Sequence, residues 1–241
     1  MKESHKLING DSLREIRKIE TDSIDFIFTD PPYNLGLFMK NRSTNLSALR
    51  SNHFSGKGWD QLEEKDWKKN MRLLFIEFSR VLKKGGSLVM FMAIIKLETI
   101  IEIANKNNFY YKTTGIWHKK NPMPRNKDLH FINSTESWLY FTHKTKTGTY
   151  NNKNKTIHDF FESALTPMSE KRFGGHPTQK PLKLMDFLIS LLSSEGDLIL
   201  DPFMGSGSSG VSAINKKRKF IGIEINKEYF AVAEKRINKK I

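Results

Sequence analysis

A glycine-rich turn lies near the C-terminal end of this chain, between an expected strand and an expected helix at residues 197–215. Its glycines are Gly205, Gly207 and Gly210. Glycines let backbone N–H groups approach a ligand closely, and the N-terminus of the following helix favours negative charge. The next expected strand ends at Glu224, whose carboxylate is placed to accept hydrogen bonds from two ribose hydroxyls. The segment therefore predicts a site for an adenosine-containing cofactor.

The late position of this turn constrains the fold. A dinucleotide-binding fold normally opens with such a turn and builds its further strands after it, but here little of the chain remains. The sheet must therefore be completed by strands that come earlier. Short apolar runs alternate with helical periodicity, which predicts an α/β fold: a Rossmann-like, doubly wound, mostly parallel sheet with helices on both faces. The expected strands are residues 6–9, 24–29, 87–92, 113–118, 136–141, 197–200 and 219–223, and the expected helices are residues 13–18, 66–83, 95–107, 181–194, 208–215 and 227–238.

The clearest of these helices is at residues 66–83. Its apolar side chains fall on one face at helical spacing, and we expect it to end before Gly85 and Gly86.

One of the earlier strands, 24–29, ends in Asp30, Pro31, Pro32 and Tyr33. These residues put a carboxylate, a rigid kink with a carbonyl acceptor and an aromatic ring at one strand terminus. The prolines fix φ and restrict the preceding residue, so the acceptors are held in place. The set suits a flat, amine-bearing ring, which needs acceptors for its amino hydrogens and a face to stack on. A plain strand followed by a Pro-Pro turn gives the same four residues, so this segment alone does not decide.

The two sites are expected at the same edge of the sheet. The carboxyl ends of parallel strands meet there, and open α/β sheets bind ligands at that edge. Adjacent pockets for a cofactor and an amine favour group transfer, and a methyl donor fits better than a hydride carrier. A NAD-dependent oxidoreductase is an alternative, because the three glycines formally satisfy G-x-G-x-x-G.

The composition indicates a polyanionic partner. The 241 residues include 40 Lys and Arg against 26 Asp and Glu, a net charge of +14, and nucleic acid is the usual partner of such a surface. The absence of cysteine excludes disulfides and Cys-based metal sites, and we predict no metal site. No apolar stretch is long enough to span a membrane and the N-terminus does not look like a signal peptide, so we expect a soluble, cytoplasmic protein.

Two segments do not fit the sheet. Residues 35–60 are polar with little periodicity, and we expect a mobile loop there. Residues 121–175 are rich in Lys, Asn, Thr and His and read as a basic insert, with one sheet strand near 136–141. The lysines and the arginine that we expect to contact phosphates are Lys119, Lys120, Arg125, Lys127, Lys144 and Lys146.

In the content and order of its motifs the chain resembles the β-group amino-methyltransferases of DNA, which use S-adenosylmethionine. Residues 30–33 match the catalytic motif of that group, and residues 176–181 (His-Pro-Thr-Gln-Lys-Pro) match the segment just before the cofactor strand. Residues 201–207 match the cofactor turn, Glu224 the ribose-binding acid, and Asp11 the residue that contacts the adenine of the cofactor.

The resemblance implies one methyltransferase domain over residues 1–241 in a permuted order, with the catalytic motif first and the cofactor turn last. Residues 121–175 would be its target-recognition region. The implied cofactor-binding residues are Asp11, Asp30, Thr178, Lys180, Asp201, Phe203, Gly205, Ser206, Gly207 and Glu224. Two of them have plainer explanations, because Asp11 could be only a helix N-cap and Lys180 could only cap a surface turn.

The implied activity is site-specific methylation of adenine N6 in double-stranded DNA, with the adenine flipped out of the duplex. Asp30 and the carbonyl of Pro31 would accept the two N6 hydrogens, and Tyr33 would stack on the base. Cytosine-N4 transfer is the nearest alternative, and Asp30 favours adenine because serine is commoner at this position in the cytosine enzymes. A non-catalytic nucleic-acid-binding module is a more distant one. The implied partners are a second copy of the chain and a separately encoded restriction endonuclease.

Overall fold

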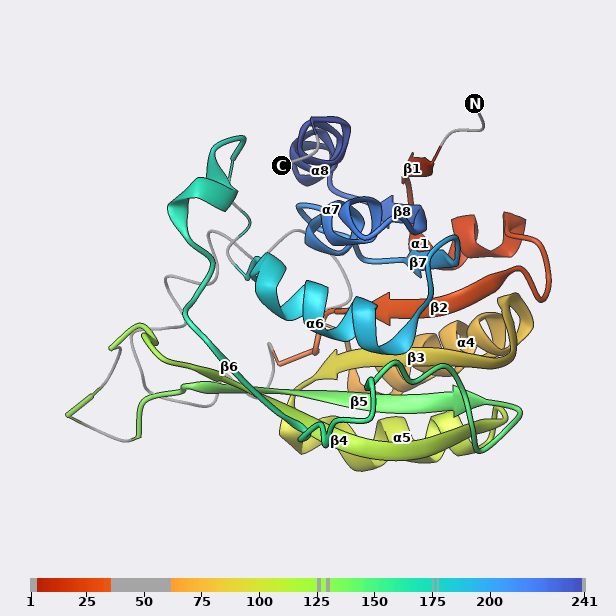
Figure 1. The fold of residues 1–241 in the computed structure, drawn as a ribbon. Coiled ribbons are helices and arrows are strands. Elements are labelled where there is room, and N and C mark those ends of the chain that lie inside the picture. Colours follow the sequence, from red (N-terminus) through yellow and green to blue (C-terminus); the bar gives the residue numbers. More distant parts are fainter. Residues whose placement is uncertain are drawn as a thin grey trace.

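The computed structural model describes residues 4–35, 62–124, 127–128, 131–174, 176 and 178–239. Its strands form one eight-stranded sheet in the order β1-β8-β7-β2-β3-β5-β4-β6 (Figure 1). The strands are β1 (His5–Asn9), β2 (Ile24–Thr29), β3 (Leu82–Met92), β4 (Phe109–Lys119), β5 (Thr135–His143), β6 (Phe160–Ser163), β7 (Leu198–Asp201) and β8 (Lys219–Glu224). The helices are α1 (Ser12–Glu15), α4 (Glu64–Val81), α5 (Leu97–Asn105), α6 (Leu182–Leu192), α7 (Ser208–Asn215) and α8 (Lys227–Asn238), with short 3-10 turns at Ile16–Lys18, Ile94–Lys96 and Met168–Lys171.

The sheet is mostly parallel, which confirms the predicted fold class. Among the described strands β5 alone runs antiparallel, between β3 and β4. The strand order reverses between β2 and β7, which pair in parallel through Ile27 and Leu200. Ligands of open α/β sheets bind at such a switch point, outside the carboxyl ends of the strands. The ends of β2 and β7 are the two places where the sequence predicts a site.

Helices cover both faces of the sheet (Figure 1). Alternate residues of β3 point to opposite faces, as the pleat of a strand requires. Leu88 and Met90 belong to the core beneath α1, α4 and α5. Val89 and Phe91 belong to the core beneath α6, α7 and α8. Burial on both faces explains why β3 reads as a nearly continuous apolar run rather than as an alternating one.

The predicted end of the helix at 66–83 was wrong. The helix α4 ends at Val81, and Leu82 already pairs with Ile24 of β2. Leu82 is fully buried, so the strand begins before the two glycines. The pairing of β2 with β3 shifts register between Ile24 and Phe26, and this shift accommodates the glycines inside β3. Strand pairing across the core overrode a local stop signal. The predicted bounds of β2, α7 and α8 were correct.

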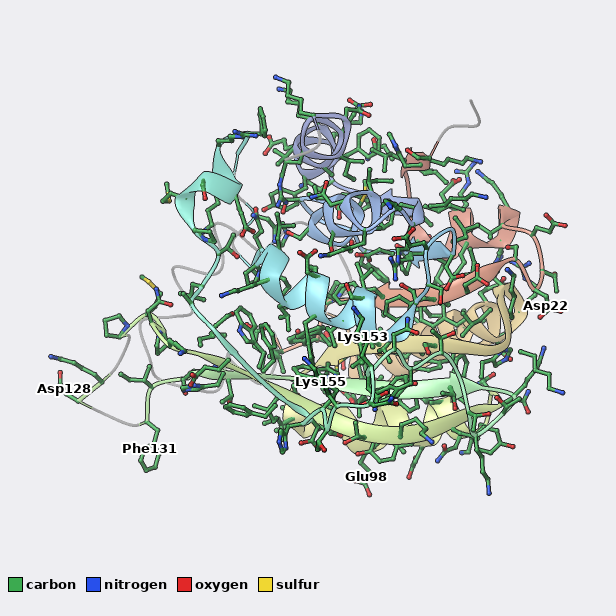
Figure 2. The ribbon with its side chains drawn as sticks, in the orientation of Figure 1. Asp22, Glu98, Asp128, Phe131, Lys153 and Lys155 are labelled. Atoms are coloured by element: carbon green, nitrogen blue, oxygen red, sulfur yellow. The ribbon has the colours of Figure 1, made fainter. Side chains whose placement is uncertain are left out.

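Two strands within the predicted insert at 121–175 belong to the sheet, and the one near 136–141 was expected. β5 lies between β3 and β4, and Trp138, which faces the core, is only 3% exposed. β6, which we did not predict, pairs with β4 as an edge strand. Its four residues show no clear alternation between buried and exposed positions, so the residue pattern did not indicate a strand there. After β4 the chain leaves the sheet at the carboxyl edge of that strand, where Figure 2 shows Asp128 and Phe131 projecting.

Two other expectations concern the chain outside the sheet. Apart from Leu35, the loop predicted at 35–60 lies outside the described residues. Every helix in the described ranges is too short or too polar to cross a lipid bilayer.

The aromatic core beneath α4 gives a stability prediction. Phe75 is fully buried and contacts Phe109 and Phe141 edge-on, with ring centroids 5.5 and 6.3 Å away. We expect Phe75→Ala to lower the free energy of unfolding by about 3–5 kcal/mol, because it removes this burial and leaves a cavity. Ile76, its neighbour on α4, is 51% exposed, and Ile76→Ala should change the free energy of unfolding by less than about 0.5 kcal/mol. Urea unfolding of both variants checks the prediction, which equal losses would contradict.

Candidate active site

The turn after β2 is held by contacts within it and from α4. The Tyr33 hydroxyl donates a hydrogen bond to Asp30 Oδ1 at 2.7 Å. The indole N–H of Trp67, on α4, donates to the carbonyl oxygen of Pro32 at 3.4 Å. Tyr33 also packs against the cores on both faces of the sheet. The carboxylate and the ring that the sequence singled out are therefore fixed relative to each other.

Lys180 reaches this carboxylate from the start of α6. Its Nζ lies 2.5 Å from Asp30 Oδ2 and 3.0 Å from Glu136 Oε2, and its side chain is only 6% exposed. The plainer explanation of Lys180 as a cap on a surface turn is therefore wrong. Burial by itself lowers the pKa of Lys180, but the two carboxylates more than reverse this, so its pKa is raised and the ammonium stays charged.

Asp201 shapes the glycine-rich turn from below. It is 2% exposed, and its Oδ1 accepts a hydrogen bond from the Phe203 N–H at 3.0 Å, while its Oδ2 accepts one from Ser209 Oγ at 2.5 Å. Gly205 and Gly207 have φ angles of +52° and +79°, a region that L side chains rarely adopt. The turn therefore depends on two glycines and on a carboxylate buried beneath them.

Glu224 closes the turn from the end of β8. Its Oε2 accepts a hydrogen bond from the Gly205 N–H at 2.9 Å, and its Oε1 accepts one from the Asn226 N–H at 2.7 Å. Burial raises the pKa of Glu224, and these backbone donors oppose the shift. Each carboxylate oxygen has a further acceptor site, so Glu224 can also accept hydrogen bonds from a ligand.

Of the remaining predicted cofactor residues, Asp11 and Phe203 lie at the turn or beside the end of β8, whereas Ser206 lies under the turn and Thr178 is exposed. Asp11 accepts a hydrogen bond from the Arg14 N–H at 3.0 Å and is the N-cap of α1, beside the end of β8. Phe203 is half-buried at the turn. In contrast, Ser206 is 4% exposed and lies under the turn, where it donates to Gln179 Oε1 at 3.0 Å. Thr178 is exposed, and its hydroxyl lies 3.2 Å from His176 Nδ1.

Three supporting residues were not assigned from the sequence. The guanidinium of Arg236, on α8, donates to the carbonyl oxygen of Ser206 at 2.6 Å and is fully buried. The His176 ring meets Tyr229 edge-on at 4.3 Å, and burial lowers the pKa of His176 to about 4, which keeps it neutral. Glu136, at the start of β5, pairs with Lys180. Position within a helix or strand gives no local signal of such long-range contacts. In the described part of the chain, no three His, Cys, Asp or Glu side chains are placed to hold a metal ion.

The residues predicted to contact phosphates are dispersed. Lys119 is mostly buried and pairs with Glu136, with 2.8 Å between Lys119 Nζ and Glu136 Oε1. Lys144 pairs with Asp22 at 3.6 Å, and Figure 2 shows Asp22 at the opposite end of the molecule from Asp128. Lys146 follows Lys144 closely after β5 and lies at that same far edge. Near the carboxyl edge Lys120 and Lys127 are exposed. The remaining one, Arg125, lies outside the described residues.

Asp201 leads to a prediction for how the free energy of unfolding depends on pH. Burial raises the pKa of Asp201 to about 7, hydrogen bonds from Ser209 and Phe203 oppose this, and the charges of Asp30 and Glu224 add to it. A carboxyl group whose pKa is higher in the folded state binds more protons there, so its contribution to stability falls as the pH rises from its ordinary pKa of 3.8 towards 7.

The substitution Asp201→Asn should remove this dependence. We expect the free energy of unfolding of the variant, relative to the unaltered protein, to be higher at pH 8 than at pH 5 by at least about 1 kcal/mol. Urea unfolding at the two pH values measures this difference. Parallel pH profiles for the two proteins would show that Asp201 is ionised throughout.

Comparison with known proteins agrees with this geometry. Residues 24–235 match the N6/N4 DNA methylase family. The chain is 34% identical to the type II methyltransferase M2.LlaDCHI of Lactococcus lactis subsp. cremoris, over 99% of this chain and 91% of that protein. It is 30% identical to the DNA adenine methyltransferase YhdJ of Escherichia coli strain K12, over 98% and 83%. The crystal structure of an M1.HpyAVI complex with S-adenosylmethionine aligns with a TM-score of 0.71 at 26% identity, over 97% of this chain and 100% of that one. The chain belongs to the N6/N4 DNA methylase family and is a DNA methyltransferase.

Proposed function

We propose that this DNA methyltransferase transfers a methyl group from S-adenosylmethionine to the N6 amino group of an adenine flipped out of double-stranded DNA. The observation that supports this most directly is the position of Asp30 and Tyr33. They lie at the end of β2, next to the turn after β7, at the switch point of the sheet. An amine-binding pocket and a cofactor turn on neighbouring strands suit group transfer between their two ligands.

The residues at the turn fit S-adenosylmethionine. Gly205 and Gly207 allow the left-handed backbone of the turn, Gly207 in close contact with Ala233 of α8, and Glu224 supplies acceptors at the end of β8, where ribose hydroxyls need them. Asp11 lies beside Glu224, since Asn9 pairs with Glu224 across the two strands. When bound, S-adenosylmethionine supplies an electrophilic methyl group on a sulfonium. We assign direct contacts to these four residues and to Phe203, and supporting roles to the buried Asp201 and Ser206.

Asp30 orients the amine. Tyr33 and Lys180 each occupy one oxygen of its carboxylate, but a carboxylate has about four acceptor sites, so Asp30 can still accept an N6 hydrogen. The Pro31 carbonyl would accept the other hydrogen. Holding both hydrogens turns the nitrogen lone pair out of conjugation with the ring and towards the methyl group. The acceptors become stronger as the nitrogen gains positive charge, which stabilises the transition state.

Adenine is favoured over cytosine for two reasons. The relative YhdJ is named as a DNA adenine methyltransferase. The position of Asp30 at the head of residues 30–33 also favours adenine. The N6/N4 family covers both bases, so cytosine N4 stays the alternative that the experiment below distinguishes.

DNA would approach the carboxyl edge of the sheet. Exposed Lys120 and Lys127 follow β4 at that edge, so phosphate contacts are proposed for these two. None is proposed for Lys144, which pairs with Asp22, or for Lys146, whose carbonyl oxygen accepts a hydrogen bond from Lys112 near the start of β4. The type II names of the relatives support a separately encoded restriction endonuclease as a functional partner. A homodimer, a cytoplasmic location and a target-recognition role for residues 121–175 stay predictions.

Methyl transfer can be tested directly. The protein is incubated with long duplex DNA that lacks methylated bases and with methyl-labelled S-adenosylmethionine, and the DNA is then digested to nucleosides. We expect the label in N6-methyladenine. Label in N4-methylcytosine would select the alternative base, and DNA binding without any label would identify a non-catalytic binding module.

Tyr33 and Glu224 should fail at different steps. Tyr33→Ala should lose most of the transfer rate, because stacking on the base is worth about 1–3 kcal/mol, while the affinity for S-adenosylmethionine stays nearly unchanged. Tyr33→Phe is the matched control that keeps the ring and removes the hydrogen bond to Asp30, so it should retain more activity. Glu224→Ala should weaken cofactor binding first. Single-turnover rates and calorimetric dissociation constants separate these effects, and equal loss of both by Tyr33→Ala would refute the stacking role.

A further inference from the structure

Asp30 is one end of a chain of four charged side chains. Lys180 Nζ bridges Asp30 and Glu136, and Glu136 in turn contacts Lys119 through its other oxygen at 2.8 Å. The side chains of Lys180, Lys119, Asp30 and Glu136 are 6%, 12%, 21% and 24% exposed. Their charges alternate along the chain and sum to zero. Buried charges are tolerated when each has an opposite partner, and here each of the four does.

The sheet brings Glu136 to this position. β5 runs antiparallel to β4, so the first residues of β5 lie at the same edge as the last residues of β4. Glu136 is opposite Trp117 in the register, and Lys119 is its diagonal neighbour two residues further along β4. Trp117 and Trp138 belong to the core beneath α6, and Glu136 follows the same face of the sheet. Lys180 comes just before α6 and meets Glu136 there.

Removal of Glu136 would change what Lys180 does to Asp30. With both carboxylates present, the ammonium charge of Lys180 is shared between them. With Asp30 alone, the ammonium would bind that carboxylate more tightly and weaken it as an acceptor for another hydrogen. Lys119 and Lys180 both bind Glu136, so their ammonium groups lie near each other. Without Glu136, Lys119 would lose its partner and the two ammonium groups would repel each other.

We propose that Glu136 is a positioning residue for methyl transfer, which shares Lys180 with Asp30 so that Asp30 stays oriented and remains a strong acceptor for the N6 hydrogen. The proposal rests on the proposed function, because it concerns how Asp30 receives the amine. Burial by itself raises the pKa of Glu136, but Lys180 and Lys119 outweigh burial and lower it, so Glu136 is ionised in this arrangement.

The test uses Glu136→Gln, which keeps the shape of the side chain and removes its charge. We expect the single-turnover rate of methyl transfer to fall by about 10- to 100-fold, because Lys180 then binds Asp30 more tightly and weakens it as an acceptor for the N6 hydrogen. The dissociation constants for S-adenosylmethionine and for DNA should change by less than about threefold, since Glu136 does not contact the proposed cofactor turn. Cofactor binding also shows that the variant is folded.

A second variant separates charge from structure. Glu136→Gln combined with Lys119→Gln removes the unpaired ammonium and restores zero net charge around Asp30 and Lys180. We expect the double variant to recover part of the rate that Glu136→Gln loses. A purely structural role predicts a further loss, because Lys119→Gln also removes the contact of the Lys119 ammonium with the Trp117 ring, 5.4 Å from its centroid.

Glu77→Gln is the matched control. Glu77 is a partly buried carboxylate on α4 that pairs with Arg80 at 2.8 Å, far along the helix from Trp67 and the turn at Asp30. Its rate should equal that of the unaltered protein. An unchanged rate in Glu136→Gln, or a double variant slower than the single one, would overturn the positioning role. Failure of the proposed function is distinct, because the unaltered protein would then place no label in adenine.

Discussion

The ion pair between Lys180 and Asp30 ties together the parts of the chain on which the site depends. The two residues are 150 positions apart, and the ammonium also holds Glu136 at the start of β5. Such a buried pair adds little net stability, because desolvation of both groups offsets much of their attraction. It does fix geometry, because a lysine displaced from its carboxylates would leave uncompensated charge inside the protein. The end of β2, the segment before α6 and the start of β5 are therefore held in one arrangement.

The cofactor turn also depends on buried polar groups. Asp201 below it accepts hydrogen bonds from Phe203 and Ser209, and Arg236 reaches from α8 to the carbonyl of Ser206. These contacts join β7, α7 and α8 around two glycines with positive φ. A backbone shape that few residues can adopt is thus fixed by its surroundings before a cofactor binds.

Local signals predicted the strand 24–29, the helices 208–215 and 227–238 and the two ligand turns. Each has its determinants within a few residues: an apolar run ending at prolines, or glycines followed by an amphipathic helix. The end of α4 at Val81 and the edge strand β6 depend on pairing with distant strands. The contacts of Glu136 and Lys119 depend on the antiparallel direction of β5, which the local sequence around these residues does not indicate. Local sequence signals therefore indicated the residues of the proposed site, whereas the side chains that hold them in place could be identified only from the topology.

The direction of β5 also has a consequence for DNA. Because β5 enters the sheet at the edge where β4 ends, the stretch between them begins and ends at that edge, and Figure 2 shows its residues Asp128 and Phe131 projecting from the molecule. Lys119 and Glu136 stand at its two ends and belong to the charged chain that reaches Asp30. A duplex that contacts this stretch would lie close to Lys119 and Glu136, whose charges are next to that of Lys180. The stretch proposed to contact DNA is thus joined, through three ion pairs, to Asp30, the carboxylate proposed to receive the base.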